Sequence, residues 1–361
     1  KGQMSKWGRM VFQAGAERGV QVLDALELGS DWTLDLHIHF LRRGRRMQAD
    51  YGVYEHVIVG SQTDMAWLPA PVRYAREDGS DGVVRVAASN VNFHYLWMGP
   101  TDEARSLSWA QIRREHRNRL DRRGRPKQHY RLWAESRPAM RHRPEVPMAI
   151  PFQCAHSGDE MGVVSGSETR REVLELIDQA LKSTRASWTG RVGRFSDRTE
   201  ANYRKAAEQL APSWFQGLFY EPRAQYDPHA MVIFRLRDQD GRPVRHYDIY
   251  FDSSGRGRSI GSLIEHRHVN SCDPNIIAFY LRTAAFDEDG GEWTDRLEDL
   301  EDFSLEITAT EPQTDRILYL PLRFDIDGRR LRRWIHPHRT TVVDVQLLRI
   351  PAPGIFDVRK T

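Results

Sequence analysis

Short apolar runs separated by loops characterise the first half of this chain. The runs at Tyr54–Gly60, Val83–Ala87 and Met148–Cys154 are compact and apolar, which is typical of buried parallel strands. Apolar residues recur at helical spacing over residues 8–25 and again over Thr169–Leu181, so both segments predict helices. A further short helix is expected just after Ser30 and Asp31, because either side chain can cap its first turn and Leu34, Leu36 and Phe40 would follow within it. The first half therefore predicts an α/β fold.

From residue 231 onward, apolar and polar residues alternate, which indicates half-buried strands. The predicted strands are Met231–Leu236, Arg245–Phe251, Ile276–Arg282, Phe303–Thr308, Ile317–Phe324, Arg329–Ile335 and Thr341–Ile350. Asp240-Gly241 and Asp327-Gly328 separate neighbouring runs and predict hairpin turns, because the central positions of such turns favour positive φ. Several short strands at this spacing predict an antiparallel β-sandwich.

The length of 361 residues suits two domains. We expect residues 1–185 to form the first domain, with an Arg-rich insertion at 102–147. Residues 186–230 are expected to form a linker with a short helical segment near Glu200–Leu210, and residues 231–361 the β-sandwich domain. If the sandwich is only an adaptor, deletion of everything after about Gly190 should spare hydrolytic activity.

Composition excludes several classes of protein. Lys plus Arg number 53 and Asp plus Glu 50, so the net charge of +3 does not favour nucleic acid as a partner. Two cysteines cannot form a disulfide scaffold, and we expect free thiols. No apolar run approaches the roughly 18 residues of a membrane span, and no signal peptide is visible, so the chain is expected to be soluble.

Two residues carry the pattern of a serine hydrolase. Asp81 follows a long loop rich in Pro, Asp and Gly, and His156 follows the apolar run that ends at Cys154. A carboxylate that precedes a histidine, each after a late strand, is the chain order of α/β-hydrolases. Asp81 would accept a hydrogen bond from Nδ1 of His156, so that Nε2 can take a proton from a serine. Alternatively, Asp81 is a turn residue, Asp78 or Asp64 takes its place, and His156 is a core or capping histidine.

The segments Gly29–Leu36, Val57–Gly60, Gly79–Ala87 and Ala155–Gly158 resemble the later half of bacterial lipases, in particular the phospholipase effectors of type VI secretion. This resemblance covers roughly residues 26–181. It implies the second half of an α/β-hydrolase core, a parallel sheet with helices, followed here by the β-sandwich. It also implies that Asp81 is the triad carboxylate, that His156 is the base, and that the substrate is an acyl ester of a membrane phospholipid.

The nucleophile is missing from this pattern, because no Gly-x-Ser-x-Gly motif precedes Asp81 and His156; the motif occurs at Gly257–Gly261, after both residues, which is not the chain order of an α/β-hydrolase. We therefore expect the serine on an N-terminal hydrolase half, upstream of Lys1 or on another chain, and an inactive protein without it. No cofactor is expected. The acidic stretch Asp287–Asp302 could hold Ca²⁺ but lacks the oxygen spacing of an EF-hand. His266, His268 and Cys272 match no common zinc spacing, so surface side chains are expected there.

The Arg-rich insertion interleaves arginines with Trp109, Tyr130 and Trp133. Anionic lipid headgroups attract arginine and aromatic rings settle at the membrane interface, so a phospholipid surface is a better partner than nucleic acid. Its position between Asp81 and His156 also suits a lid. The resemblance further implies a secreted antibacterial effector that acts in the periplasm of a target cell and is blocked by an immunity protein. The alternative function is a catalytically incomplete module whose β-sandwich recognises a partner protein or a membrane.

Overall fold

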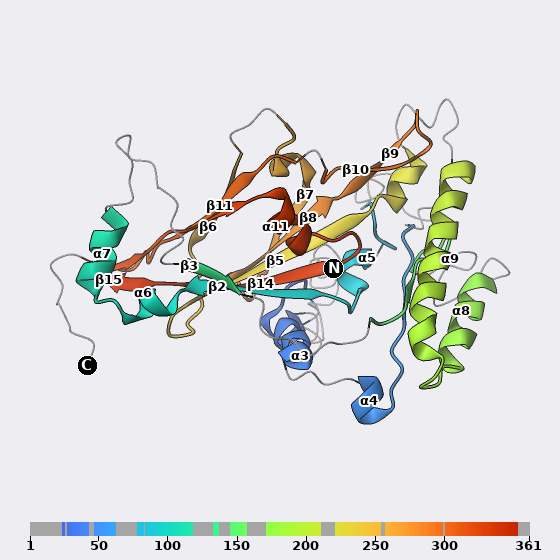
Figure 1. The fold of residues 1–361 in the computed structure, drawn as a ribbon, viewed down its shortest axis with the longest axis horizontal. Helices are drawn as coiled ribbons and strands as arrows, with labels where there is room; N and C mark the ends of the chain where they lie inside the picture. Colours follow the sequence, from blue (N-terminus) through green and yellow to red (C-terminus); the bar gives the residue numbers. More distant parts are fainter. Residues whose placement is uncertain are drawn as a thin grey trace, which may run out of the picture.

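The computed structural model describes most of the chain. The described ranges are residues 24–25, 27–42, 47–62, 78–82, 84–117, 133–136, 145–156, 171–210, 221–253, 257–298 and 300–352. Most of the helix predicted over residues 8–25 lies outside these ranges, as do Asp64 and Tyr130. The described residues combine two larger sheets, three two-stranded sheets and helices at both ends of the molecule (Figure 1).

The largest sheet has six strands and draws them from both halves of the chain. In spatial order they are β3 (Trp133–Ser136), β2 (His94–Pro100), β14 (Thr340–Leu347), β5 (His229–Asp238), β8 (Ile276–Arg282) and β7 (Ile264–Val269). Strand β14 is parallel to both β2 and β5, and the other pairs are antiparallel. The sheet is therefore mixed and includes residues before 186, which differs from the predicted antiparallel sandwich of residues 231–361. Alternation marks a half-buried strand but does not specify its partner or direction.

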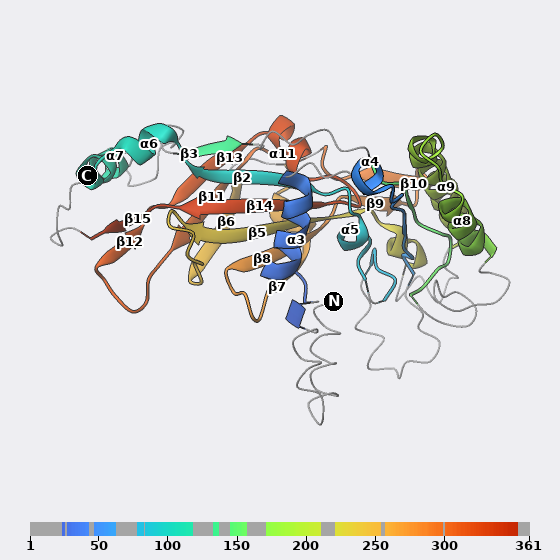
Figure 2. The same cartoon turned by 90° about the horizontal axis from the view of Figure 1, so that it is seen from below.

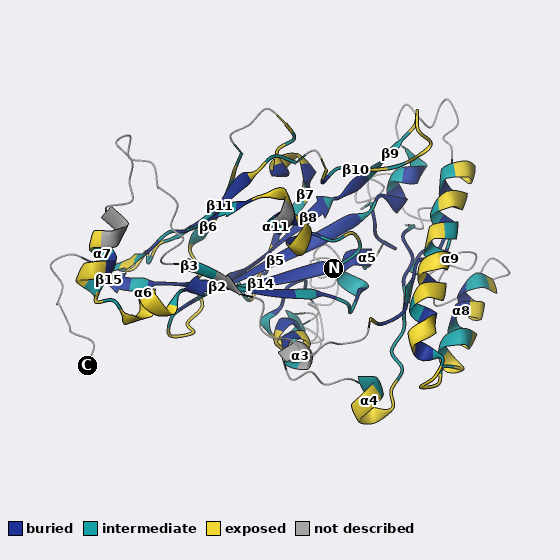
Figure 3. Ribbon diagram, viewed as in Figure 1, coloured by how far each residue is buried: buried dark blue, intermediate teal, exposed yellow. Residues whose placement is uncertain are grey.

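A second sheet packs on one face of the first. It contains β6 (Tyr247–Ser253), β11 (Phe303–Ala309) and β13 (Leu322–Ile326), all antiparallel, with β11 in the centre. Phe251 of β6 meets Phe279 of β8 edge to face at 5.3 Å. Apolar side chains from both sheets form one buried core, which appears as the dark interior of Figure 3. Burial of this apolar area is the main stabilising contribution to this part of the molecule.

Helix α3 (Asp31–Arg42) covers the opposite face of the six-stranded sheet and crosses its strands (Figure 2). Its first turn is capped as predicted, because the backbone N–H of Thr33 donates to Ser30 Oγ at 3.3 Å. Leu34 and Ile38 face the sheet, whereas Leu36 is exposed. The short helix α5 (Val86–Ser89) contributes Ala87 to the same core.

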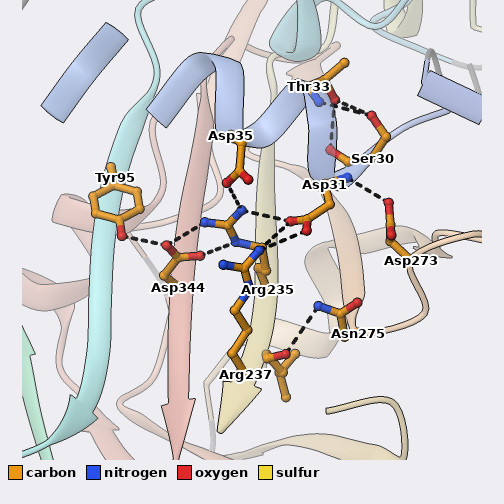
Figure 4. A network of polar contacts seen from close by, with 11 residues as sticks. Ser30, Asp31, Thr33, Asp35, Tyr95, Arg235, Arg237, Asp273, Asn275 and Asp344 are labelled. Atoms are coloured by element: carbon orange, nitrogen blue, oxygen red, sulfur yellow. Dashed lines mark hydrogen bonds and ion pairs between the residues drawn. The ribbon is translucent and has the colours of Figure 1, made fainter. Parts of the chain in front are cut away.

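A buried arginine joins α3 to two strands of the sheet (Figure 4). The Arg235 side chain on β5 is only 3% exposed, and its Nε and Nη2 donate to the Asp344 carboxylate on β14 at 2.6 and 2.8 Å. Its Nη1 donates to Asp31 at 2.9 Å and also to Asp35, both on α3. The Tyr95 hydroxyl on β2 donates to Asp344 at 2.6 Å. The buried charge is thus paired and hydrogen-bonded on several sides.

A smaller α/β unit lies at one end of the molecule, opposite α7, and there α8 (Arg171–Leu181) and α9 (Trp188–Gln209) run side by side (Figure 1). Its strands β1 (Val57–Ile58) and β4 (Met148–Ala149) are parallel, as predicted. One face of this pair packs against the helices through Ala149, Leu176 and Phe195. The other face contributes Val59 and Ile150 to a cluster with Val86.

Three segments differ from the sequence prediction. Val86 and Ala87, expected to lie in a buried strand, lie in helix α5 instead. Residues 188–199, expected to belong to a linker, belong to α9, which buries Trp188 and Phe195 among its polar residues. Residues 329–335, expected to be a strand, lie in α11 (Gly328–Trp334) and the residue after it. Asp327 caps this helix by accepting from the Arg330 N–H at 2.7 Å, so Asp327-Gly328 starts a helix and makes no hairpin.

Asp240-Gly241 does form a turn, with φ of +82° at Gly241, but the strands on either side enter different sheets. The remaining elements are short. They are α4 (Met47–Tyr51), η3 (Pro222–Tyr226), η4 (Ile260–Leu263) and the strand pairs β9 (Ala284–Asp287) with β10 (Glu292–Asp295) and β12 (Ile317–Tyr319) with β15 (Arg349–Pro351).

Three elements of the Arg-rich insertion, α6 (Asp102–Ser106), α7 (Trp109–Arg117) and β3, lie far from α8 and α9, as both views show (Figures 1 and 2). The last residues of the insertion lead into β4, and the Pro147 carbonyl accepts from the Val57 N–H at 2.9 Å. Arg113 Nη1 donates to the Pro351 carbonyl at 3.0 Å, which fastens α7 to β15. Within the described ranges, no helix is both long enough and apolar enough to cross a membrane.

Candidate active site

Asp81 lies in a tight loop at the carboxyl side of β1. Two hydrogen bonds hold this loop in place. Asp81 Oδ1 accepts from the Val84 N–H at 2.7 Å, and Ser80 Oγ accepts from the Gly82 N–H at 3.1 Å. Gly82 has φ of +92°, a conformation that glycine adopts without strain. Asp81 itself is 5% exposed. A turn of this kind fixes the direction in which the second carboxylate oxygen points.

His156 is brought to Asp81 by the strand next to β1. Its Nδ1 lies 3.0 Å from Asp81 Oδ2, although the two residues are 75 positions apart in sequence. The backbone adds a second link, since the His156 N–H donates to the Asp81 carbonyl at 3.0 Å. The two predicted residues are therefore in direct contact.

Gly60 permits this close approach at the end of β1. A Cβ at this position would lie 2.0 Å from the Cys154 carbonyl oxygen and 3.3 Å from the Asp81 Cβ. The first distance is impossible for a real side chain, so only glycine lets the β1 end, the Asp81 loop and the His156 loop meet. The Gln62 N–H also donates to the Cys154 carbonyl at 3.1 Å. The apolar run ending in glycine was thus a useful signal in the sequence.

The pair has the polarity that proton transfer requires. The Asp81 side chain is 4% exposed and the His156 side chain 40% exposed. Because Asp81 Oδ2 accepts from Nδ1, the proton of the neutral imidazole is held on Nδ1 and Nε2 offers its lone pair. A buried carboxylate behind a half-exposed imidazole can stabilise the imidazolium while the other ring nitrogen faces a reactant.

Of the two alternatives to Asp81, Asp78 binds other residues: its carboxylate accepts from Gln225 Nε2 at 2.8 Å and from Arg282 Nη2 at 3.2 Å. Asp64 lies outside the described residues. Of the three aspartates considered from the sequence, the structure therefore brings Asp81 to His156.

No hydroxyl or thiol of a described residue forms a hydrogen bond with Nε2 of His156. Among the described residues, a serine does contact a different histidine: Ser183 Oγ lies 3.0 Å from His56 Nε2. There Nδ1 of His56 faces the Tyr54 carbonyl at 2.9 Å, with no carboxylate behind the ring. Ser183 Oγ also lies 3.2 Å from the Gln179 carbonyl, so it satisfies the end of α8. This contact therefore belongs to the C-terminal end of α8, and it does not supply a nucleophile to the Asp81–His156 pair.

Within the described ranges, no group of three or more His, Cys, Asp and Glu side chains is arranged to hold a metal ion. Cys272 is exposed and Cys154 is buried, and both are free thiols. Burial raises the pKa of Cys154 to about 12. A thiol with that pKa is protonated at neutral pH, so Cys154 is a poor nucleophile despite its position two residues before His156.

Residues from the C-terminal part also reach this site, and the sequence analysis missed them. The Tyr280 hydroxyl on β8 lies 3.0 Å from the Asp78 carbonyl and 3.1 Å from the Gly79 carbonyl. The Arg85 guanidinium lies over the Tyr280 ring at 4.2 Å. Tyr280 is about 200 residues away in sequence from the loop it supports. No local pattern could have indicated this contact.

Of the comparisons with known proteins, the one with solved structures gives matches. No protein-family model matches the sequence, and no curated protein matches it either. Among solved structures, phospholipase PlaB from Legionella pneumophila in complex with thio-NAD superposes with a TM-score of 0.68 and 22% identity, over 97% of this chain and 69% of that one. A second PlaB structure gives a TM-score of 0.66 and 22% identity, over 95% and 65% of the two chains.

Identity at this level establishes likeness of fold only. The chain spans about two thirds of the length of the PlaB chains. The comparison supports a mixed α/β fold like that of a bacterial phospholipase, but it does not confirm the predicted hydrolase core followed by a β-sandwich. It does not bear on the resemblance to type VI secretion effectors. This chain therefore has a mixed α/β fold similar to that of a bacterial phospholipase.

Proposed function

We propose that this chain provides the acid and base of a serine esterase that hydrolyses acyl ester bonds of membrane phospholipids. The observation that carries the proposal is the 3.0 Å contact between Asp81 Oδ2 and His156 Nδ1. A binding module has no need for a buried carboxylate that orients the imidazole in this way. The likeness to a phospholipase fold supports the choice of substrate class.

In the proposed reaction, His156 Nε2 takes the proton of a serine hydroxyl as the serine oxygen bonds to the ester carbonyl carbon. Asp81 keeps the ring oriented and stabilises its positive charge. The tetrahedral intermediate then expels the alcohol, a lysophospholipid, which receives the proton from Nε2. Water repeats the sequence on the acyl-enzyme and releases a fatty acid.

The serine would come from outside these 361 residues, because no Gly-x-Ser-x-Gly precedes Asp81 and His156, and Ser259 of the motif at Gly257–Gly261 follows both residues and forms no hydrogen bond with His156 in the described structure. We propose that an N-terminal hydrolase half, preceding Lys1 or on another chain, supplies it together with the oxyanion hole. The effector role and the immunity protein follow from the sequence resemblance, and the anionic phospholipid surface follows from the Arg-rich insertion; all three stay predictions.

The test uses the complete protein with phosphatidylglycerol vesicles and a soluble p-nitrophenyl ester. Asp81→Asn and His156→Ala should each lower kcat by about 10⁴-fold, because the base is lost or its tautomer is wrong. Asp248→Asn and His246→Ala are matched controls at exposed positions and should act like the wild type. Full activity in either site variant, with an unchanged circular dichroism spectrum, would remove the assignment.

A further inference from the structure

Two consecutive residues of η3 contact the two loops that carry Asp81 and His156. The Gln225 carbonyl accepts from the Gly79 N–H at 3.1 Å, and Gln225 Nε2 donates to Asp78 at 2.8 Å. The next residue, Tyr226, accepts from the Gln153 N–H through its hydroxyl oxygen at 2.6 Å. Gly79 lies two residues before Asp81, and Gln153 lies three before His156. One short helical turn therefore touches both loops.

The Asp81 loop is pressed tightly against the C-terminal part. Gly79 has φ of +66°, and a Cβ there would lie 2.6 Å from His229 Nδ1 and 2.7 Å from the Tyr280 hydroxyl. The His229 and Tyr280 rings stack at 4.5 Å with an angle of 4° between them. This flat, buried surface fixes the position of the backbone at residue 79.

The His156 loop contains a residue in an unfavourable backbone conformation. Gln153 has φ of +49°, a left-handed conformation that costs a non-glycine residue of order 1 kcal/mol or more. Its N–H points at Tyr226, whose ring also stacks on Phe152 at 6.1 Å. Without the Tyr226 oxygen, the Gln153 N–H would lose this hydrogen-bond acceptor, and relaxation of the loop out of the left-handed conformation would be favoured.

We propose that Gln225 and Tyr226 are positioning residues for the proposed esterase, and that η3 sets the distance between the Asp81 carboxylate and the His156 imidazole by holding one loop with each residue. The inference rests on the proposed function for its catalytic consequence, but the positioning itself is a structural statement that can be measured separately.

The first experiment is Tyr226→Phe in the complete protein. Burial raises the pKa of Tyr226, so the hydroxyl is neutral and the substitution removes one oxygen and no charge. We expect the hydrogen-bonded Nδ1 proton of His156, followed by NMR, to broaden or exchange faster with solvent. We also expect kcat to fall roughly tenfold with KM within about twofold, because the loss is one of orientation.

Tyr203→Phe is the matched control. Tyr203 packs edge to face against Tyr226 at 5.7 Å. Its hydroxyl lies 3.0 Å from His338 Nε2, so its hydrogen bond does not involve the Asp81 loop or the His156 loop. It therefore loses a buried tyrosine hydroxyl of the same kind at a nearby place. The Nδ1 proton signal and kcat should stay at the wild-type values. Equal effects of the two substitutions would overturn the inference, since loss of stability alone would then explain them.

A double-mutant cycle separates this inference from the proposed function. If Tyr226 acts through the pair, Tyr226→Phe should change kcat by less than about twofold once Asp81→Asn is present. A full tenfold effect in that background would refute positioning while leaving the esterase proposal intact. Conversely, if Asp81→Asn alone has no effect on kcat, the proposed function fails, and the NMR signal in Tyr226→Phe still decides whether η3 holds the loop.

Discussion

Arg235 is the residue whose loss should be most costly among the buried charges that the structure describes. Arg235→Met would leave the Asp344 carboxylate without its bidentate partner, in a site where the arginine is 3% exposed. We expect the free energy of unfolding to fall by about 3 to 5 kcal/mol, measured by urea denaturation. Arg237→Met is the control, because Arg237 is 34% exposed and should contribute less than about 1 kcal/mol. Similar losses in both variants would contradict this account.

Asp227 should make stability depend on pH. Burial raises its pKa to about 6, even though Arg282 lowers it. This value exceeds the roughly 3.9 of an unfolded aspartate, so the stabilising form is the protonated one, and its contribution is lost as pH rises through about 6. Relative to Asp227→Asn, which cannot titrate, the wild type should lose up to about 3 kcal/mol between about pH 4 and pH 7. A difference in unfolding free energy that stays constant with pH would contradict the raised pKa.

The contact between Asp81 and His156 could be predicted from residue order alone, because each follows an apolar run and the order is that of a hydrolase. The residues that hold them could not. Tyr226 and Tyr280 lie in unremarkable sequence, and their hydroxyls reach backbone groups 73 and about 200 residues away. Contacts between a side chain and a distant backbone leave no local pattern to read.

Helix α11 provides a test among the secondary-structure elements. Asp327→Ala removes the side chain that accepts from the Arg330 N–H. We expect a loss of about 1 kcal/mol in the free energy of unfolding, measured by urea denaturation. Asp327→Asn should stay within a few tenths of the wild type, because asparagine caps equally well. If both substitutions have the same effect, the cap is not what stabilises the start of this helix.

Elements with one clear period were predicted well, and elements in mixed surroundings were not. Strands β1 and β4, helix α8 and the capped start of α3 agree with their patterns. The sequence predicts a strand in place of helix α11, because the apolar residues of this helix are few and only Leu331 and Trp334 of the helix reach the core. The sequence predicts too short a helix in place of α9, because arginines interrupt the apolar pattern of its first half, although Phe195 is fully buried there.

At the scale of the molecule, the two halves of the chain are interwoven. Strand β14 pairs along its length with β2 on one side and β5 on the other. Strand direction and neighbours in such a sheet depend on contacts far apart in sequence, so the alternating pattern could not supply them. The predicted separation at residue 231 therefore misses a sheet that spans it.

This topology reverses one expectation. A chain that ends after about Gly190 would lack β14, β5 and η3, and with them one of the two strand partners of β2 and the η3 contacts of both site loops. We expect such a truncation of the complete protein to lose hydrolysis of a soluble ester and to show weak backbone protection in hydrogen exchange over residues 78–100. Wild-type hydrolysis by the truncated protein would contradict the supporting role of the C-terminal part.

The position of α6 and α7 changes the interpretation of the Arg-rich insertion. Arg113 fastens α7 to β15, and both helices lie at the opposite end of the molecule from α8 and α9 (Figure 1). Helices α6 and α7 are thus not placed as a lid over Asp81 and His156. A lipid-facing role for its arginines stays a prediction from the sequence.

The measurement that tests the central claim most directly is covalent trapping of the nucleophile with a fluorophosphonate in the complete protein, followed by peptide mapping. We predict one labelled serine outside these 361 residues, labelled at least about 100-fold more slowly in His156→Ala because the base is gone. Ser183→Ala, which alters the other serine–histidine contact, should label like the wild type. Labelling that is unchanged by His156→Ala, or abolished by Ser183→Ala, would contradict the account.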